Sequence, residues 1–111
     1  MILSAKESGA DAVKIQSFKV DTFCLKKSKY YSLFEKCQLD EFELSELYDY
    51  AENLGILFFS SVFDEWSVNI NYELNTKCYK IASGDINNLP LLNMVAKKSL
   101  PMIISTGASN L

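Results

Sequence analysis

Four short apolar segments recur along this chain, and each of them ends in small polar residues; they lie at 12–18, 56–61, 79–85 and 101–107. Phe59, Ile81 and Ile103, in the middle of three of them, are equally spaced. Apolar runs of this length, bounded by turn residues, predict strands that are buried on both faces. With helical stretches between them, such strands form right-handed parallel crossovers. The pattern therefore predicts an α/β fold, either a (β/α)8 barrel or an open doubly wound sheet.

The connecting stretches carry helix signals. In the stretch 40–54, Asp40 can cap a helix, and Glu43 completes a capping-box arrangement. The stretch 64–74 alternates between polar and large apolar residues, which by period alone indicates a strand. We nevertheless predict a helix there, because parallel strands need a crossover between them. Asn88 is expected to cap the last helix, with Pro90 in its first turn.

Composition excludes several classes of protein. The 111 residues leave room for one domain, and the net charge of −3, with no arginine, argues against general nucleic-acid binding. No apolar run approaches the roughly 20 residues of a membrane span, and the N-terminus lacks the pattern of a signal peptide. The three cysteines form no C-x-x-C pair, so we expect free thiols in a reducing cytoplasm. Histidine is absent, which removes the commonest general base and metal ligand.

Two lysines lie within predicted strands, Lys14 in the first and Lys80 in the third. Burial of an unpaired ammonium group costs several kcal/mol, so a lysine inside a domain needs an anion. That anion is either a protein carboxylate or a ligand. The alternative is that both side chains extend outward between helices and keep their charges in water.

The polar strand ends form the second candidate feature. Ligands of α/β folds bind at the carboxyl ends of strands, and a ring of hydroxyls and lysines there would suit a phosphate or a carboxylate. The alternative is that these serines, glycines and threonines only make turns and cap helices. Asp85 is a candidate general base, a hydrogen-bond partner for sugar hydroxyls, or a turn residue.

Four motifs carry a resemblance to a known family. They are GADAVKIQSF at 9–18, GILFFSSVFD at 55–64, YKIASGDINNLPLL at 79–92 and ISTG at 104–107. In this order, over nearly the whole chain, they resemble the N-acetylneuraminate (sialic acid) synthase family, which includes legionaminic and pseudaminic acid synthases and spore-coat polysaccharide proteins.

The resemblance implies a fold and a reaction. Residues 1–111 would be part of one phosphoenolpyruvate-dependent barrel domain, a partial TIM (β/α)8 barrel with about strands two to five and their intervening helices. The family condenses phosphoenolpyruvate with an N-acetylmannosamine-type sugar, forms a C–C bond and releases phosphate. It uses a divalent metal, Mn²⁺ or Mg²⁺, whose ligands lie outside this chain, and the full-length proteins are expected to be homodimers.

The resemblance also assigns residues. Asp85 would be catalytic, and Gln16 and Asp85 would face the sugar. The residues expected to hold phosphoenolpyruvate are Lys14, Ser61, Lys80, Ser83 and Ser105. No metal ligand is assigned. Strict alternation would put Lys80 and Ser83 on opposite faces, so both can meet one ligand only if the strand ends or bulges near Ala82.

The chain departs from the family pattern at four positions. Ser61 replaces the threonine that is usual in the family, Val62 replaces proline, Asp85 replaces glutamate and Ala108 replaces methionine. Ser61 keeps the hydroxyl contact. Asp85 shortens the carboxylate reach by one methylene, which is expected to weaken sugar binding or to change which sugar fits.

The chain is too short to form a complete barrel, because a (β/α)8 barrel needs about 250 residues. We therefore expect this polypeptide to be a fragment that is inactive alone and that exposes open sheet edges prone to self-association. Two alternatives remain open. One is a Schiff-base aldolase barrel with Lys80 as nucleophile. The other is a non-catalytic, truncated relic.

Overall fold

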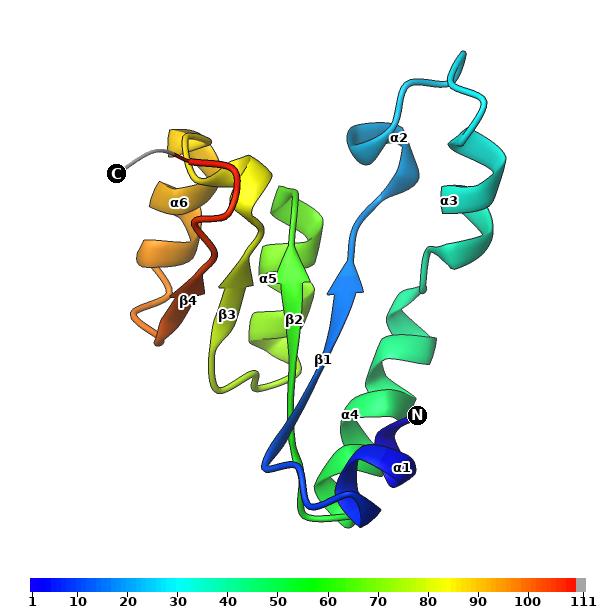
Figure 1. Ribbon diagram of the computed structural model, residues 1–111, viewed down its shortest axis with the longest axis vertical. Helices are drawn as coiled ribbons and strands as arrows, with labels where there is room; N and C mark the ends of the chain where they lie inside the picture. Colours follow the sequence, from blue (N-terminus) through cyan, green and yellow to red (C-terminus); the bar gives the residue numbers. More distant parts are fainter. Residues whose placement is uncertain (110–111) are drawn as a thin grey trace.

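The computed structural model describes residues 1–109, and within that range the strands form one parallel sheet in the order β1-β2-β3-β4 (Figure 1). The strands are β1 (Ala12–Ser17), β2 (Leu57–Val62), β3 (Tyr79–Ile81) and β4 (Met102–Ile104). A doubly wound sheet reverses its strand order at a switch point, whereas this order follows the chain without reversal. The sheet is therefore that of a partial (β/α)8 barrel, as the sequence predicts.

The helices follow the predicted rhythm: α1 (Ile2–Glu7), α2 (Val20–Phe23), α3 (Tyr31–Cys37), α4 (Glu41–Asn53), α5 (Glu65–Glu73) and α6 (Leu89–Ala96). Asp40 and Glu43 form the expected capping box of α4. Gly55, just after α4, has φ +64°, a conformation that glycine adopts without steric cost. The prediction of a helix at 64–74 is confirmed by α5, and Asn88 caps α6 as expected.

One face of the sheet carries the hydrophobic core. Val62, Tyr79 and Ile81 are fully buried and pack with Leu91 and Val95 of α6. On the same face, towards β1, Phe58 packs with a second cluster that includes residues of α1 and α4. Helices thus cover this face, and strand alternation turns the intervening side chains to the opposite face.

The opposite face is partly open in the described part of the chain, although Phe59 and Ser61 on it are buried. Leu57 and Ile103, which point to it by alternation, are 39% and 47% exposed. β1 and β4 are the two edges of the sheet within residues 1–109. This arrangement agrees with the expectation that the chain exposes sheet edges and the inner face of a barrel.

Several strand boundaries differ from the sequence prediction, and one of the largest differences is at the carboxyl end of the fourth strand. The strand predicted at 101–107 is shorter, because β4 ends at Ile104 and a turn follows.

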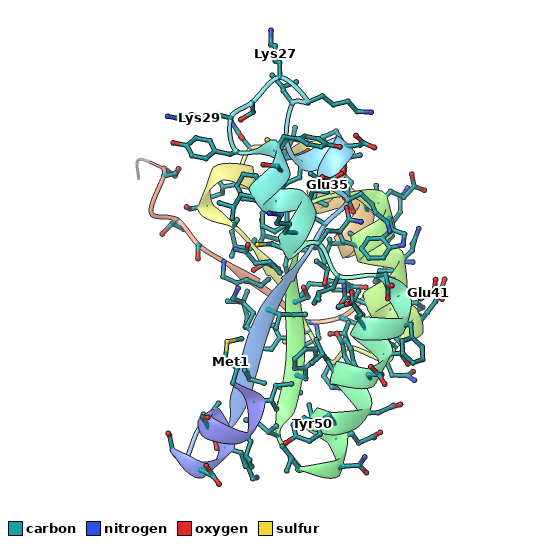
Figure 2. All side chains as sticks on the ribbon, turned by 90° about the vertical axis from the view of Figure 1, so that its right-hand side faces the viewer. Met1, Lys27, Lys29, Glu35, Glu41 and Tyr50 are labelled. Carbon is teal, nitrogen blue, oxygen red and sulfur yellow. The ribbon has the colours of Figure 1, made fainter. Side chains whose placement is uncertain are left out.

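The long connection 19–40 contains α2 and α3, which lie beside the carboxyl end of β1 (Figure 1). Lys27 and Lys29 lie at the outer tip of the loop between them and point away from the sheet (Figure 2). Within the described range, no helix has the length and apolarity that a bilayer crossing requires.

Candidate active site at the carboxyl ends of the strands

A row of side chains crosses the open face of the sheet. Gln16 is paired in register with Ser61, and Ser61 with Lys80, so the three neighbours share one face. Lys14 lies two residues before Gln16 and points to the same face. The structure therefore brings together two lysines, a serine and a glutamine from three strands, all of which the sequence had proposed.

The two lysines contact neutral oxygen atoms. Lys14 Nζ donates to Ser61 Oγ at 3.0 Å and to the backbone oxygen of Ile15 at 3.2 Å. Lys80 Nζ donates to the backbone oxygen of Ile81. Partial burial, and then repulsion from the nearby Lys80 ammonium, lowers the pKa of Lys14. Lys80 lies in register with Ser61, the hydrogen-bond partner of Lys14, so both ammonium groups lie on this part of the face.

The expectation that both ammonium groups are buried is wrong for the described chain. Lys14 is exposed, and Lys80 is only half-buried. The physical reason is that alternation fixes the face to which a side chain points, whereas burial depends on what covers that face. Phe59 and Ser61 on the same face are buried, whereas water still reaches both lysines.

Within the described residues, neither Lys14 nor Lys80 has a carboxylate partner. Among residues 1–109, the recorded ion pair joins Lys26 and Asp21 at the surface, with 3.3 Å between Nζ and Oδ1. The alternative that Lys14 and Lys80 extend outward between helices fails, because both point to the open face with Ser61. Two neighbouring cations with hydroxyl and carbonyl partners leave room for an external anion.

The remaining predicted residues lie at the carboxyl edge of the sheet. β3 ends at Ile81, and Ser83–Asp85 form a single 3-10 turn, so strand alternation does not govern the direction of Ser83. Ser105 follows β4, and its N–H donates to the oxygen of Ile81 at 3.2 Å. In the part of the chain that is described, the side chains of Gln16, Ser83 and Ser105 make no recorded hydrogen bond. They share an edge with the lysines but make no recorded hydrogen bond to them within the described residues.

Asp85 belongs to a different part of this edge. Its Oδ1 accepts a hydrogen bond of 3.1 Å from Nδ2 of Asn88, the cap of α6. It also lines a hollow of about 400 Å³ at the carboxyl ends of the strands. The hollow is lined by Thr22, Phe23, Phe63, Ala82, Gly84, Asp85 and Asn88. Sequence reasoning missed the lining residues from α2, because nothing local indicated that the connection 19–40 returns to this edge.

The adjacent serines at two strand ends have separate roles. Ser17 and Ser60 point to the helix-covered face, are buried, and share a hydrogen bond of 2.7 Å between their Oγ atoms. Ser61, next to Ser60, points to the open face and meets Lys14. One hydroxyl pair therefore ties β1 to β2, whereas Ser61 is left for the site.

A metal does not fit the described residues. The chain has no histidine, and residues 1–109 contain no group of three or more Cys, Asp or Glu side chains that could hold a metal ion. Residues 1–109 therefore do not by themselves form a metal-binding site.

The sequence profile of the NeuB family matches residues 1–111. The chain belongs to the NeuB family. An uncharacterized protein of Methanocaldococcus jannaschii is 46% identical over 111 residues, with all of this chain and 33% of that protein covered. The N,N'-diacetyllegionaminic acid synthase of Legionella pneumophila is 42% identical over 125 residues, with all of this chain and 35% of the synthase covered.

A solved structure shows the same fold. The N-acetylneuraminic acid (sialic acid) synthetase of Leptospira borgpetersenii, in complex with citrate, superposes with a TM-score of 0.94 at 29% identity. The superposition covers 99% of this chain and 39% of that protein. This NeuB chain thus spans about a third of the length of the curated relatives it matches.

Proposed function

We propose that this NeuB chain provides the phosphoenolpyruvate-binding strands of a nonulosonic acid synthase. The observation that carries the proposal is the pair Lys14 and Lys80, which share one sheet face with Ser61 and have no carboxylate partner in residues 1–109. Charge-assisted hydrogen bonds from two ammonium groups suit a phosphate and a carboxylate on one small molecule. The citrate bound by the Leptospira relative likewise carries several negative charges, which supports an anion as ligand.

In the proposed reaction these residues bind and orient the substrates. Lys14, Ser61 and Lys80 hold the phosphoenol acid, and Ser83 and Ser105 add hydroxyl donors from the same edge. Gln16 and Asp85 face the neutral amino sugar, and Asp85 accepts a proton or a hydrogen bond from a sugar hydroxyl. Two fixed cations also stabilise negative charge that develops on the phosphate as it leaves.

The proposal also covers the metal, the cellular location and the oligomeric state of the protein. A divalent metal, Mn²⁺ or Mg²⁺, would supply Lewis-acid activation of the sugar aldehyde, with ligands from outside residues 1–109. The cysteines Cys24, Cys37 and Cys78 are free thiols, which agrees with a cytoplasmic setting. We also propose that the full-length protein forms a homodimer.

Direct titration tests the proposed ligand. We expect calorimetry to show that the chain binds phosphoenolpyruvate more tightly than pyruvate, because only the former carries a phosphate for the second lysine. Equal affinity for the two acids would contradict the proposal.

Borohydride reduction in the presence of pyruvate distinguishes the proposed synthase from the aldolase alternative. Schiff-base chemistry at Lys80 would add the mass of a reduced pyruvyl group to the peptide that contains it, whereas synthase chemistry forms no imine. We expect mass spectrometry to find Lys80 unmodified.

The lowered pKa of Lys14 predicts a pH dependence. The free protein loses the Lys14 proton at a lower pH than an ordinary lysine does, so phosphoenolpyruvate affinity should fall as pH rises through that lowered value. In the variant Lys14→Arg, the guanidinium stays charged over the same alkaline range, so the affinity of the variant should fall less steeply than that of the parent chain. Calorimetric titrations at a series of alkaline pH values test this, and parallel profiles for the two proteins would refute it.

A further inference from the structure

Charge is divided unevenly along the chain. Residues 25–33 contain three lysines and no acid, whereas residues 37–76 contain nine aspartates and glutamates and no lysine. The two stretches also reach opposite ends of the molecule, because Lys27 and Lys29 lie at one end of its longest axis and Tyr50 of α4 lies near the other (Figure 2). The chain therefore has a basic tip, residues 25–33, and an acidic end around the second half of α4.

The acidic end contains a hollow of about 260 Å³. Three exposed carboxylates line it, those of Asp49, Glu52 and Glu73, together with one lysine, Lys77, and an apolar wall that includes Phe58. Within residues 1–109, none of the three carboxylates makes a recorded ion pair or side-chain hydrogen bond. The hollow thus combines an excess of negative charge with an apolar surface. We call it the acidic hollow.

The basic tip offers the complementary groups. Leu25, Tyr30 and Leu33 are 70%, 52% and 56% exposed, which is unusual for large apolar side chains that lie so close together in the chain. Lys29 lies over the ring of Tyr30, with 5.0 Å between Nζ and the ring centroid. Lys27 is exposed and has no recorded partner within residues 1–109. The tip therefore presents cations and apolar side chains together.

We propose that two copies of this chain pair antiparallel, with the basic tip of each at the acidic hollow of the other. A twofold axis across the middle of the long axis brings both ends into contact at once, and twofold dimers are the commonest closed assemblies. Lys27 and Lys29 then meet carboxylates that have no partner of their own in residues 1–109, and opposite charges fix the register of the two copies. This inference rests on the proposed function in one respect, the homodimer, whose interface it identifies.

Sedimentation velocity of the intact chain tests the pairing. A dimer should form, and its dissociation constant should rise about tenfold or more between about 0.05 M and about 0.5 M salt, because salt screens exposed charges. Pairing through the open strand edges uses backbone hydrogen bonds and apolar contacts, so it would not weaken in this way. A dimer that is insensitive to salt, a chain that stays monomeric, or growth beyond the dimer would overturn the proposal.

Lys27→Glu and Lys97→Glu form a matched pair of variants. Both lysines are exposed, and both substitutions change the net charge equally. Lys27→Glu should weaken the dimer about tenfold or more, because a twofold dimer carries the substitution at both contacts. Lys97 lies just after α6, so Lys97→Glu should pair as the parent chain does. Equal effects of the two substitutions would contradict a contact at the tip.

Reversal of charge on both surfaces provides a rescue experiment. One variant combines Lys27→Glu with Lys29→Glu, and the other combines Asp49→Lys with Glu52→Lys; all four positions are exposed, so both variants should fold. Each variant alone sets like charges against each other and should stay monomeric. An equimolar mixture restores opposite charges at both contacts and should form a heterodimer. A mixture that stays monomeric, or either variant that pairs alone as the parent does, would overturn the proposal.

Titration with phosphoenolpyruvate separates this interface from the proposed anion site at Lys14 and Lys80. The substituted residues lie outside that site, so both double variants should bind phosphoenolpyruvate as the parent chain does. If the mixture pairs but the parent chain does not bind phosphoenolpyruvate, the interface stands and the anion site fails. If phosphoenolpyruvate binds and the chain forms a dimer that no charge reversal weakens, the anion site and the homodimer stand and this interface is wrong.

Discussion

Lys80→Met should weaken phosphoenolpyruvate binding by about tenfold to a hundredfold, the scale of a lost hydrogen bond to a charged group. Methionine keeps most of the apolar stem of Lys80 and removes only the ammonium group. Lys80 lies in register with Ser61 and has no carboxylate partner within residues 1–109, so its charge is free for the ligand. Calorimetric titration of both proteins measures the ratio of dissociation constants.

Lys77→Met is the matched control for this substitution. Lys77 is exposed and lies before β3, at the amino end of that strand, away from the proposed anion site. Its loss changes the net charge equally, so a purely long-range effect of charge would appear in both variants. A similar loss of affinity in Lys77→Met would contradict a specific role for Lys80.

Asp64→Ala should lower the free energy of unfolding by about 2–3 kcal/mol, because one side chain supports two elements. Loss of a helix cap costs about 1 kcal/mol, and each further hydrogen bond about as much again. Asp64 accepts from Ser67 N–H at the start of α5 and, at 2.7 Å each, from Lys19 N–H and Thr22 Oγ1. Urea denaturation followed by circular dichroism measures the change.

Asp40→Ala provides the comparison, since Asp40 caps α4 in the same way but its side chain makes no recorded hydrogen bond to a second element within residues 1–109. Its expected cost is therefore that of one cap, about 1 kcal/mol. If the two substitutions destabilise the chain equally, the bonds from Asp64 to α2 contribute nothing measurable. In that case Asp64 would not hold Phe23 at the hollow.

Local signals in the sequence predicted most of the fold. The capping residues Asp40 and Asn88 lie next to the helices they start, so their effect depends on a few neighbouring residues. The stretch 64–74 was harder, because its alternation matched a strand. The crossover requirement correctly predicted α5, in which Val68 and Ile70 are buried whereas Tyr72 is exposed.

The candidate site was predicted in part. Four motifs marked the strand ends and singled out Lys14, Gln16 and Ser61, and the register between β1 and β2 places these side chains on one face. The sequence did not reveal that Lys14 meets Ser61 or that Thr22 and Phe23 line a hollow with Asp85. These contacts join residues far apart in the chain, and no local pattern records them.

The sequence by itself determined the order of strands and helices, the family and the identity of the polar residues at the strand ends, because periodicity, caps and motifs are local properties. Only the tertiary structure decided the neighbours of each side chain and their exposure to water. Register between strands brought Ser61 and Lys80 together, and the open face left Lys14 in contact with solvent. Both depend on packing between distant segments, since a strand fixes the direction of a side chain but not what lies opposite it.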